Sequence, residues 1–215
     1  MTHEEIISNS GLLLVAGSET VATLLSGATY YLLRNPSILK RLQDEVRSAF
    51  NTENDINLES VGNSAHLPYM EAVLTESLRL YPPVPASLLR MTGPEGDVID
   101  GNFIPPHTSV GVHRWATYRS AANFTDPDSF VPERWLADPP ERYRTDDRAA
   151  FQPFSLGPRN CLGRNLAWFE MRSILARILW NFDMMLCDES RGWASQKSYL
   201  LWDKPSLWVN LSRRA

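Results

Sequence analysis

The sequence has few cysteines and no excess of basic residues, and both shortages exclude classes of protein. Cys161 and Cys187 are the only two cysteines, too few for the disulfide framework of a small secreted domain, and such usage is typical of a reducing compartment. Lys and Arg number 21 against 25 Asp and Glu, a net charge of −4. A chain with this balance has no electrostatic footprint for nucleic acid, so we expect no nucleic-acid partner.

The amino terminus also lacks the positive charge that begins a secretory signal, because residues 1–5 are acidic. We therefore predict neither a signal nor a membrane anchor in this chain. Residues 11–33 are long and apolar enough to suggest a membrane span. Glu19 near their centre would make insertion costly, so a buried core helix is the favoured interpretation.

The remaining composition, with 43% hydrophobic and 21% charged residues in 215, is ordinary for one or two globular domains. Apolar spacing and proline positions predict helices near 35–50 and 67–81. An Asp-Gly pair predicts a hairpin over 98–104, and further short strands are expected over 108–112, 182–186 and 199–211.

The most informative stretch is 154–163, Phe-Ser-Leu-Gly-Pro-Arg-Asn-Cys-Leu-Gly. Apolar residues at helical spacing follow it, so Cys161 would lie at or just before a helix N-terminus, which stabilises a thiolate. One thiolate suits a single axial bond to a large cofactor better than a closed metal cage. Gly157 and Gly163 would let the backbone approach a flat macrocycle, and Arg159 would supply a cation for its carboxylates. The alternative is a buried structural cysteine before an ordinary helix.

Two weaker patterns lie on the expected helices. Residues 16–20, Ala-Gly-Ser-Glu-Thr, place a glycine inside a helix at a cost of about 1 kcal/mol, which predicts a local distortion there. The alternative is that Thr20 bonds its own helix carbonyl and Glu19 faces solvent. Glu76 and Arg79 have the i, i+3 spacing that places both on one helix face, and the default interpretation is a surface pair.

Together these motifs resemble the signatures of the cytochrome P450 family, in that family's order and over nearly the whole chain. Phe-x-x-Gly-x-Arg-x-Cys-x-Gly is similar to its haem-binding signature, residues 16–20 to its distal-helix motif, and Glu76-x-x-Arg79 to its buried ion pair. The resemblance implies a mainly α fold with small β-sheets (α+β), the carboxyl-terminal half of the P450 fold. Residues 1–215 would then form a partial domain whose amino-terminal half is absent.

The resemblance also implies a role for each matching residue. Cys161 would be the proximal thiolate ligand of the iron of haem b (iron protoporphyrin IX), with Phe154 packed beside it. Arg159 and Arg90 would pair with the propionates, although Arg90 reads equally well as a solvated strand-edge residue. Contacts to the cofactor would come from Gly157, Gly163, Ala16 and Gly17, and proton delivery during oxygen activation from Thr20 and Glu19. A structural ion cluster would consist of Glu76, Arg79 and Arg134.

The implied activity is that of a monooxygenase, which inserts one oxygen atom from O2 into a small, largely apolar organic substrate. Electrons would come from NADPH-cytochrome P450 reductase. Residues 132–136 and 201–207 look most like fungal members of specialised metabolism. The full-length family implies the cytosolic face of the endoplasmic reticulum membrane, reached through the amino-terminal part. Two alternatives stay open: a non-catalytic remnant, and a haem-thiolate isomerase, dehydratase or peroxygenase, over which Glu19 and Thr20 favour the monooxygenase.

Overall fold

A computed structural model describes residues 1–214 and shows a helical body with three small sheets. The α-helices are α1 (His3–Arg34), α2 (Pro36–Ala49), α3 (Leu58–Gly62), α4 (Pro68–Leu80), α5 (Arg114–Tyr118) and α6 (Arg164–Asn181). The strands are β1 (Arg90–Met91), β2 (Asp97–Ile99), β3 (Asn102–Ile104), β4 (Ser109–Val110), β5 (Phe182–Leu186) and β6 (Val209–Arg213). Short 3₁₀ helices are η1 (Glu53–Asp55), η2 (Ser64–His66), η3 (Pro132–Trp135), η4 (Glu141–Tyr143), η5 (Arg148–Ala150), η6 (Gly157–Arg159) and η7 (Asp188–Ser190). The expected fold class, mainly α with small β-sheets, is confirmed.

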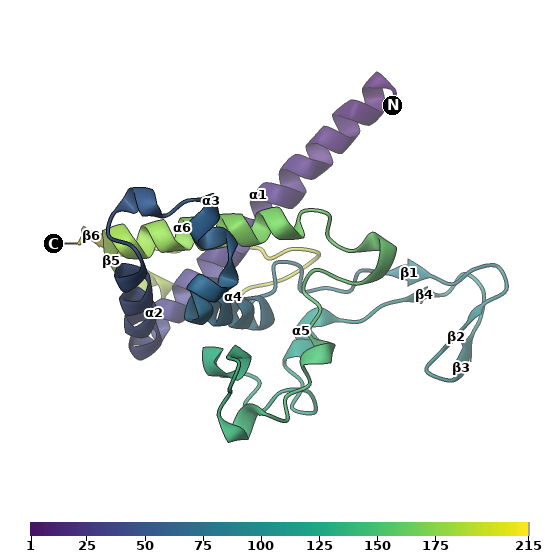
Figure 1. Ribbon diagram of the computed structural model, residues 1–215. Coiled ribbons are helices and arrows are strands. Elements are labelled where there is room, and N and C mark those ends of the chain that lie inside the picture. The colour runs from purple at the N-terminus through teal and green to yellow at the C-terminus, as the bar shows by residue number, and fades with distance from the viewer. Residues whose placement is uncertain (215) are drawn as a thin grey trace.

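The core lies where the second half of α1 packs against α2, α4 and α6 (Figure 1). Apolar residues at helical spacing form it, because each of these helices buries one face against the others. Leu24, Leu42, Leu74 and Leu175, one from each helix, have no exposed surface. This core fixes α1 and α6 in relation to each other, and the candidate site lies between their neighbouring parts.

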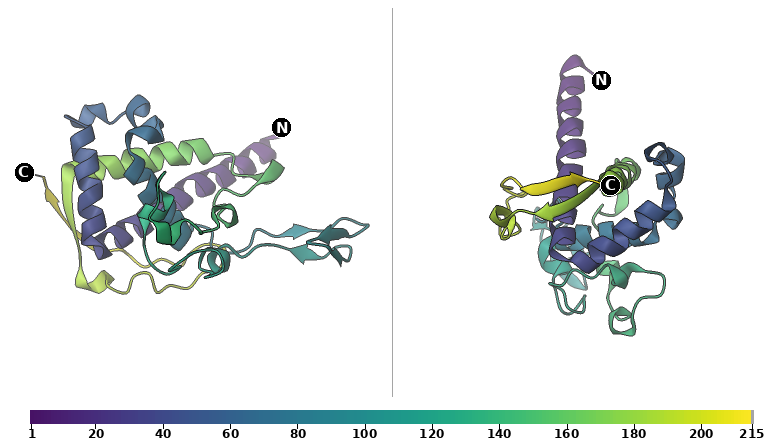
Figure 2. Two further views of the ribbon diagram at one scale, coloured as in Figure 1. Left: turned by 60° about the horizontal axis from the view of Figure 1, so that its bottom comes forward. Right: turned by 90° about the vertical axis from the view of Figure 1, so that its left-hand side faces the viewer.

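The first half of α1 leaves this body and projects away from it (Figures 1 and 2). Residues 1–18 are exposed, and Leu12, Leu13, Leu14 and Val15 each expose more than half of their surface. By length and composition α1 is the one helix among the described residues that could cross a membrane, which is weak evidence because core helices pass the same test. The prediction of a buried core helix therefore holds only from Val21 onward.

The predicted distortion at residues 16–20 is wrong, since α1 is one continuous α-helix through Gly17. The Thr20 hydroxyl donates to the Ala16 carbonyl oxygen at 2.6 Å, and Ser18 bonds Leu14 in the same way. These bonds keep the hydroxyl groups within the helix. A single glycine costs too little to interrupt a helix of 32 residues.

Helix α4 is the most deeply buried element, and another helix caps its amino end. Pro68 is its first residue, where a missing N–H is harmless, and its N-cap Leu67 makes no side-chain cap. Instead the Glu45 carboxylate on α2 accepts bonds from the Tyr69 and Met70 amides, both at 2.8 Å. This cap, supplied by α2, satisfies amides at the start of α4 and joins the two helices.

The sheets are small and antiparallel. In the hairpin β2–β3, Asp100 and Gly101 both have positive φ, 49° and 74°, as a tight Asp-Gly turn requires. Strand β4 pairs with β1, and β5 pairs with β6. The expected strand over 199–211 is wrong for most of its length, because β6 begins only at Val209 and the residues before it form a loop.

That loop packs on the carboxyl-terminal end of α4 through aromatic residues. The Trp202 ring stacks on Tyr81 with centroids 4.8 Å apart, and its indole N–H donates to the Pro82 carbonyl oxygen at 2.7 Å. The Trp193 indole donates to Pro205 at 2.9 Å. These contacts bring residues 202–205 beside α1 and the end of α4.

Candidate cofactor site

The cysteine lies in a tight loop just before α6. The Cys161 amide donates to the Phe154 carbonyl oxygen at 2.8 Å, which closes the loop. Gly157 has a φ of 74°, a left-handed value that glycine adopts at little cost. Cys161 stands two residues before Gly163, the N-cap of α6, and its side chain is exposed. The loop therefore presents a free thiol outward and does not bury it, which excludes the alternative of a buried structural cysteine.

A cavity of about 230 Å³ opens above this thiol, between the loop and α1. Cys161, Phe154 and Arg159 line it from the loop, while Ala16 and Thr20 line it from α1. The remaining walls are mostly apolar and come from α1, α4, the segment that follows α4, and α6: Val21, Leu24, Leu78, Pro82, Pro83, Val84, Leu88, Ala167 and Met171. Two segments far apart in the sequence thus face each other across one apolar space.

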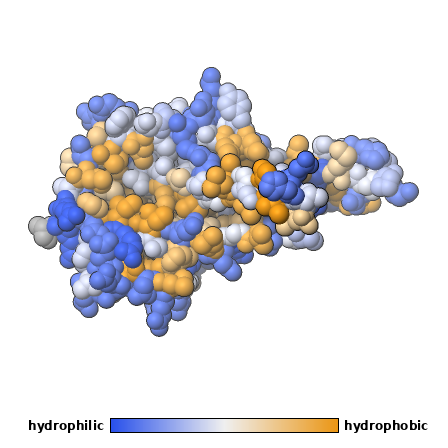
Figure 3. Space-filling view, turned by 90° about the horizontal axis from the view of Figure 1, so that it is seen from above, coloured by the Kyte–Doolittle hydropathy of each residue, from blue (hydrophilic) through white to orange (hydrophobic). Residues whose placement is uncertain are grey.

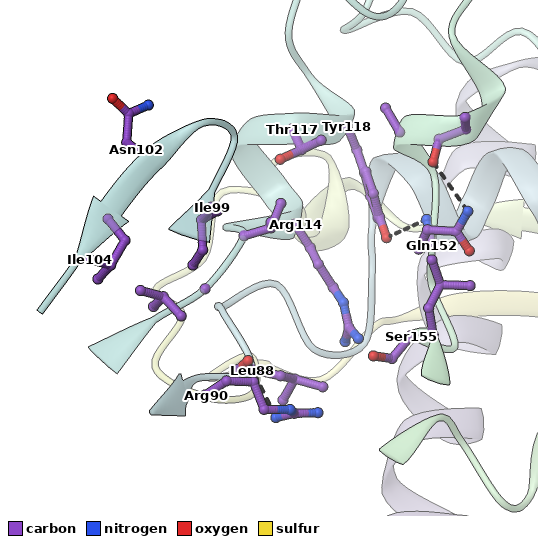
Figure 4. Close-up of a pocket in the computed structure, with 16 residues that line it drawn as sticks. Leu88, Arg90, Ile99, Asn102, Ile104, Arg114, Thr117, Tyr118, Gln152 and Ser155 are labelled. Carbon is purple, nitrogen blue, oxygen red and sulfur yellow. Dashed lines mark hydrogen bonds between the residues drawn. The ribbon is translucent and has the colours of Figure 1, made fainter. Parts of the chain in front are cut away.

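Several residues expected at the cofactor do not line this cavity. Gly17, Gly157 and Gly163 are absent from its walls, and a Cβ built at any of them would meet no atom within 4 Å. Arg90 lies instead in a neighbouring space of about 890 Å³ (Figure 4). Its guanidinium donates to the Leu89 carbonyl oxygen at 2.9 Å. The roles assigned to these four residues remain predictions.

Glu19 points away from the cavity toward the carboxyl-terminal loop. Its carboxylate accepts bonds from Lys204 and, at 3.3 Å, from the Thr23 hydroxyl, and Lys204 donates to that hydroxyl at 2.6 Å. The bond from Lys204 holds the pKa of Glu19 below its ordinary value. Lys204 was not foreseen, because 185 residues separate it from Glu19. Thr20 does line the cavity, but its hydroxyl bonds its own helix, which was the structural alternative.

A buried ion cluster joins α4 to the irregular segment that precedes the cysteine loop. The Glu76 carboxylate accepts bonds from Arg79 at 2.7 and 2.9 Å and from Arg134 at 3.2 Å, and all three side chains are at most 1% exposed. The Val131 amide and the Trp135 indole, at 2.9 and 2.8 Å, complete its shell. Glu76 and Arg79 are therefore not the surface pair that their spacing alone suggests.

Asp146 is a fourth member that sequence reasoning missed. It forms a salt bridge with Arg134, and both side chains are 1% exposed, so two acids balance two guanidiniums. The second guanidinium, Arg79, also donates to carbonyl oxygens of the irregular segment, those of Tyr118, Pro127 and Ser129. The cluster thus ties α4 to the segment over 118–146 that leads into the cysteine loop.

The side chains around the cavity fit a flat, largely apolar cofactor with a thiolate-ligated metal and acidic groups at its edge. An exposed thiol offers one axial bond, apolar walls suit a macrocycle, and the guanidinium of Arg159 suits a carboxylate. A second guanidinium, Arg114 of α5, lines the same cavity and was not singled out by its sequence. Burial lowers the pKa of Arg114 from its ordinary value, with Arg90 acting in the same direction.

Fold and cavity together define the class: a mainly helical protein whose cofactor cavity has a thiol on one wall and a long helix on the other. Residues 1–209 match the family model described as Cytochrome P450. Over the whole chain the sequence is 50% identical to the cytochrome P450 monooxygenase astA of Talaromyces wortmannii and 50% identical to averantin hydroxylase of Dothistroma septosporum. Over 98% of the chain it is 51% identical to the cytochrome P450 monooxygenase lcsI of Purpureocillium lilacinum. The chain belongs to the cytochrome P450 family.

Membership implies a haem cofactor, and the relatives are fungal. The chain spans 43%, 41% and 40% of the lengths of these three relatives.

Proposed function

We propose that this chain carries the haem-binding part of a monooxygenase that inserts one oxygen atom from O2 into a small, largely apolar organic substrate. The observation that carries the proposal is the shared cavity, where the exposed thiol of Cys161 faces the helix bearing Thr20 across mostly apolar walls. The names of the fungal relatives, monooxygenases and a hydroxylase, support the reaction class. They also favour a place in specialised metabolism.

The proposed cofactor is haem b, which Cys161 would hold through its thiolate, with Phe154 beside the sulfur and Arg159 at a propionate. When bound, a haem with a thiolate ligand supplies the electron donation that favours O–O cleavage. Leu24, Leu78 and Met171 exclude water from the cavity and favour an apolar substrate. These residues bind and orient the reactants, which is how a protein contributes to cofactor chemistry.

Proton delivery is the step that the polar residues of α1 would serve. Thr20 lines the cavity, and its O–H group would donate a hydrogen bond into the cavity once it releases the Ala16 carbonyl oxygen. Glu19 lies one residue away with its carboxylate on Lys204, so in this proposal it reaches the cavity by exchanging that partner. Lys204 would then set how often the carboxylate is free to pass on a proton.

The proposal includes NADPH-cytochrome P450 reductase as electron donor, and the endoplasmic reticulum membrane as location for the family's full-length members.

To test the reaction, haem-loaded chain, reductase and NADPH are incubated under ¹⁸O2 with a mixture of small apolar compounds. A product that gains a single ¹⁸O atom is the expected result. No labelled product would contradict the proposal, while turnover with hydrogen peroxide alone would favour the peroxygenase.

Thr20→Ala tests the proton step in the same assay. We expect more NADPH to be consumed for each product formed, with the difference released as hydrogen peroxide. Ser26→Ala is the matched control, because Ser26 makes the same bond to a carbonyl four residues earlier but does not line the cavity. Equal coupling in the two variants would remove Thr20 from the mechanism.

A further inference from the structure

Arg114 is held in place by the backbone around it. It is the first residue of α5, whose N-cap His113 accepts a bond from the Ala116 amide at 3.4 Å. The neighbouring Trp115 amide donates to the Pro85 carbonyl oxygen at 3.0 Å, and His113 forms a β-bridge with Ser87. The short helix is thus fastened to the segment that follows α4, so the direction of the Arg114 side chain is set by the fold.

This side chain enters the cavity and finds no acceptor there. Figure 4 shows the guanidinium reaching from α5 toward Ser155. The residue is half-buried. Burial and the charges of neighbouring groups shift the pKa of Arg114, and no hydrogen bond contributes to that shift. Within residues 1–214 its guanidinium forms no salt bridge, whereas Arg119 at the end of the same helix pairs with Asp128 and the Leu80 carbonyl oxygen. The five N–H donors of this guanidinium are therefore available to acceptor groups of a ligand, in exchange for water.

The position of Arg114 also distinguishes it from Arg90. Arg114 lies on the wall common to both cavities, together with Leu88 and Ser155, whereas Arg90 lines only the larger one. The guanidinium of Arg90 is already bonded to its own strand, at the Leu89 carbonyl oxygen. Two guanidiniums, those of Arg114 and Arg159, therefore share the cavity with the thiol of Cys161.

We propose that Arg114 binds one of the two haem carboxylates, with Arg159 on the other, in addition to any contact that Arg90 makes from the larger cavity. This inference rests on the proposed function, because it takes haem as the occupant of the cavity. A fork of N–H donors matches a carboxylate in a charge-assisted pair, and two cations beside two carboxylates leave no net charge at this edge. Arg114 is thus a cofactor-binding residue additional to those that the motifs identify.

The test measures, by absorbance, the rate at which the loaded chain loses haem to excess apomyoglobin. The rate is measured for haem b and for haem dimethyl ester, in which both carboxylates are masked. The variants are Arg114→Met, Arg114→Lys, Arg90→Met and Arg213→Met. The last removes an exposed arginine of β6 outside both cavities. We expect Arg114→Met to lose haem b on the order of 10- to 100-fold faster than the parent chain, the range for a charge-assisted pair, with partial recovery in Arg114→Lys.

The ester separates a carboxylate contact from a packing effect. The parent chain should lose the ester faster than haem b. The ratio of these two rates should shrink in Arg114→Met but persist in Arg213→Met. An unchanged ratio in Arg114→Met, or a ratio that shrinks equally in Arg213→Met, would overturn the assignment. Circular dichroism identifies a misfolded variant, and the comparison then uses Arg114→Gln. If the parent chain takes up haem with a thiolate spectrum and Arg114→Met loses haem at the same rate as the parent, this inference alone is wrong. If the parent chain does not show a thiolate spectrum, the proposed function is wrong.

Discussion

Neutralising Glu76 should destabilise the chain more than any single change at its surface. Its carboxylate is fully buried and accepts five hydrogen bonds, from Arg79, Arg134, Val131 and Trp135. Glu76→Gln keeps the shape but leaves two guanidiniums with only Asp146 as buried counter-charge. Removing one partner of a buried pair costs about 3–5 kcal/mol, a large share of the total stability of a domain.

Urea unfolding followed by circular dichroism measures this cost. With a slope of about 1–3 kcal/mol per molar, the midpoint should fall by at least about 1 M. Asp44→Asn is the control, because the Lys40–Asp44 pair has the same charges at i, i+4 spacing but is 75% and 61% exposed. The control should change stability by less than about 1 kcal/mol.

A double variant distinguishes the ionic argument from loss of packing. Glu76→Gln with Arg79→Met removes one charge of each sign and leaves Arg134 paired with Asp146. Its cost should be clearly less than the sum of the two single variants, because the singles each strand a buried charge. Additive costs, or a loss below about 1 kcal/mol for Glu76→Gln, would refute the reasoning.

Two further predictions concern α1. Because Lys204 holds the pKa of Glu19 below its ordinary value of 4.5, their interaction should stabilise the fold above about pH 5 and fade as the pH falls through the lowered pKa. Urea unfolding across pH 3–7 should therefore show Lys204→Met less stable than the parent at neutral pH and equal to it at the acid end, and a pH-independent difference would contradict this. Gly27→Ala should destabilise by about 1–3 kcal/mol, because its Cβ would lie 2.9 Å from Tyr81 Cγ in the core. Gly11→Ala, with no atom within 4 Å, should stabilise α1 by up to about 1 kcal/mol, and equal effects of the two changes would be inconsistent with the packing described.

Local patterns predicted the elements well, because the information for each lies within a few residues. Pro36 and Pro68 predict two helix starts, and Asp100 with Gly101 predicts the hairpin turn, since each restricts the backbone at its own position. The strand expected over 199–211 failed because its apolar residues serve another purpose. Trp202 packs on Tyr81 as part of a loop, which alternation alone does not reveal.

The site was predictable only where a motif is continuous in sequence. The loop around Cys161 and the Glu76–Arg79 pair are such cases. Asp146 lies in an irregular segment without periodicity, and Arg114 begins a helix of five residues that carries no distinguishing pattern. Lys204 meets Glu19 from 185 residues away. These partners are set by tertiary packing, so a sequence without aligned relatives does not identify them.

The central claim is that the thiol of Cys161 ligates haem in the cavity between the cysteine loop and α1. The most direct measurement is the absorbance difference spectrum of the reduced, haem-loaded chain with and without carbon monoxide. We predict a Soret band at the long wavelength characteristic of thiolate ligation, lost in Cys161→Ser and retained in Cys187→Ser, whose cysteine is half-buried and lies outside the cavity. A chain that takes up no haem, or a thiolate band that survives in Cys161→Ser, would contradict the account.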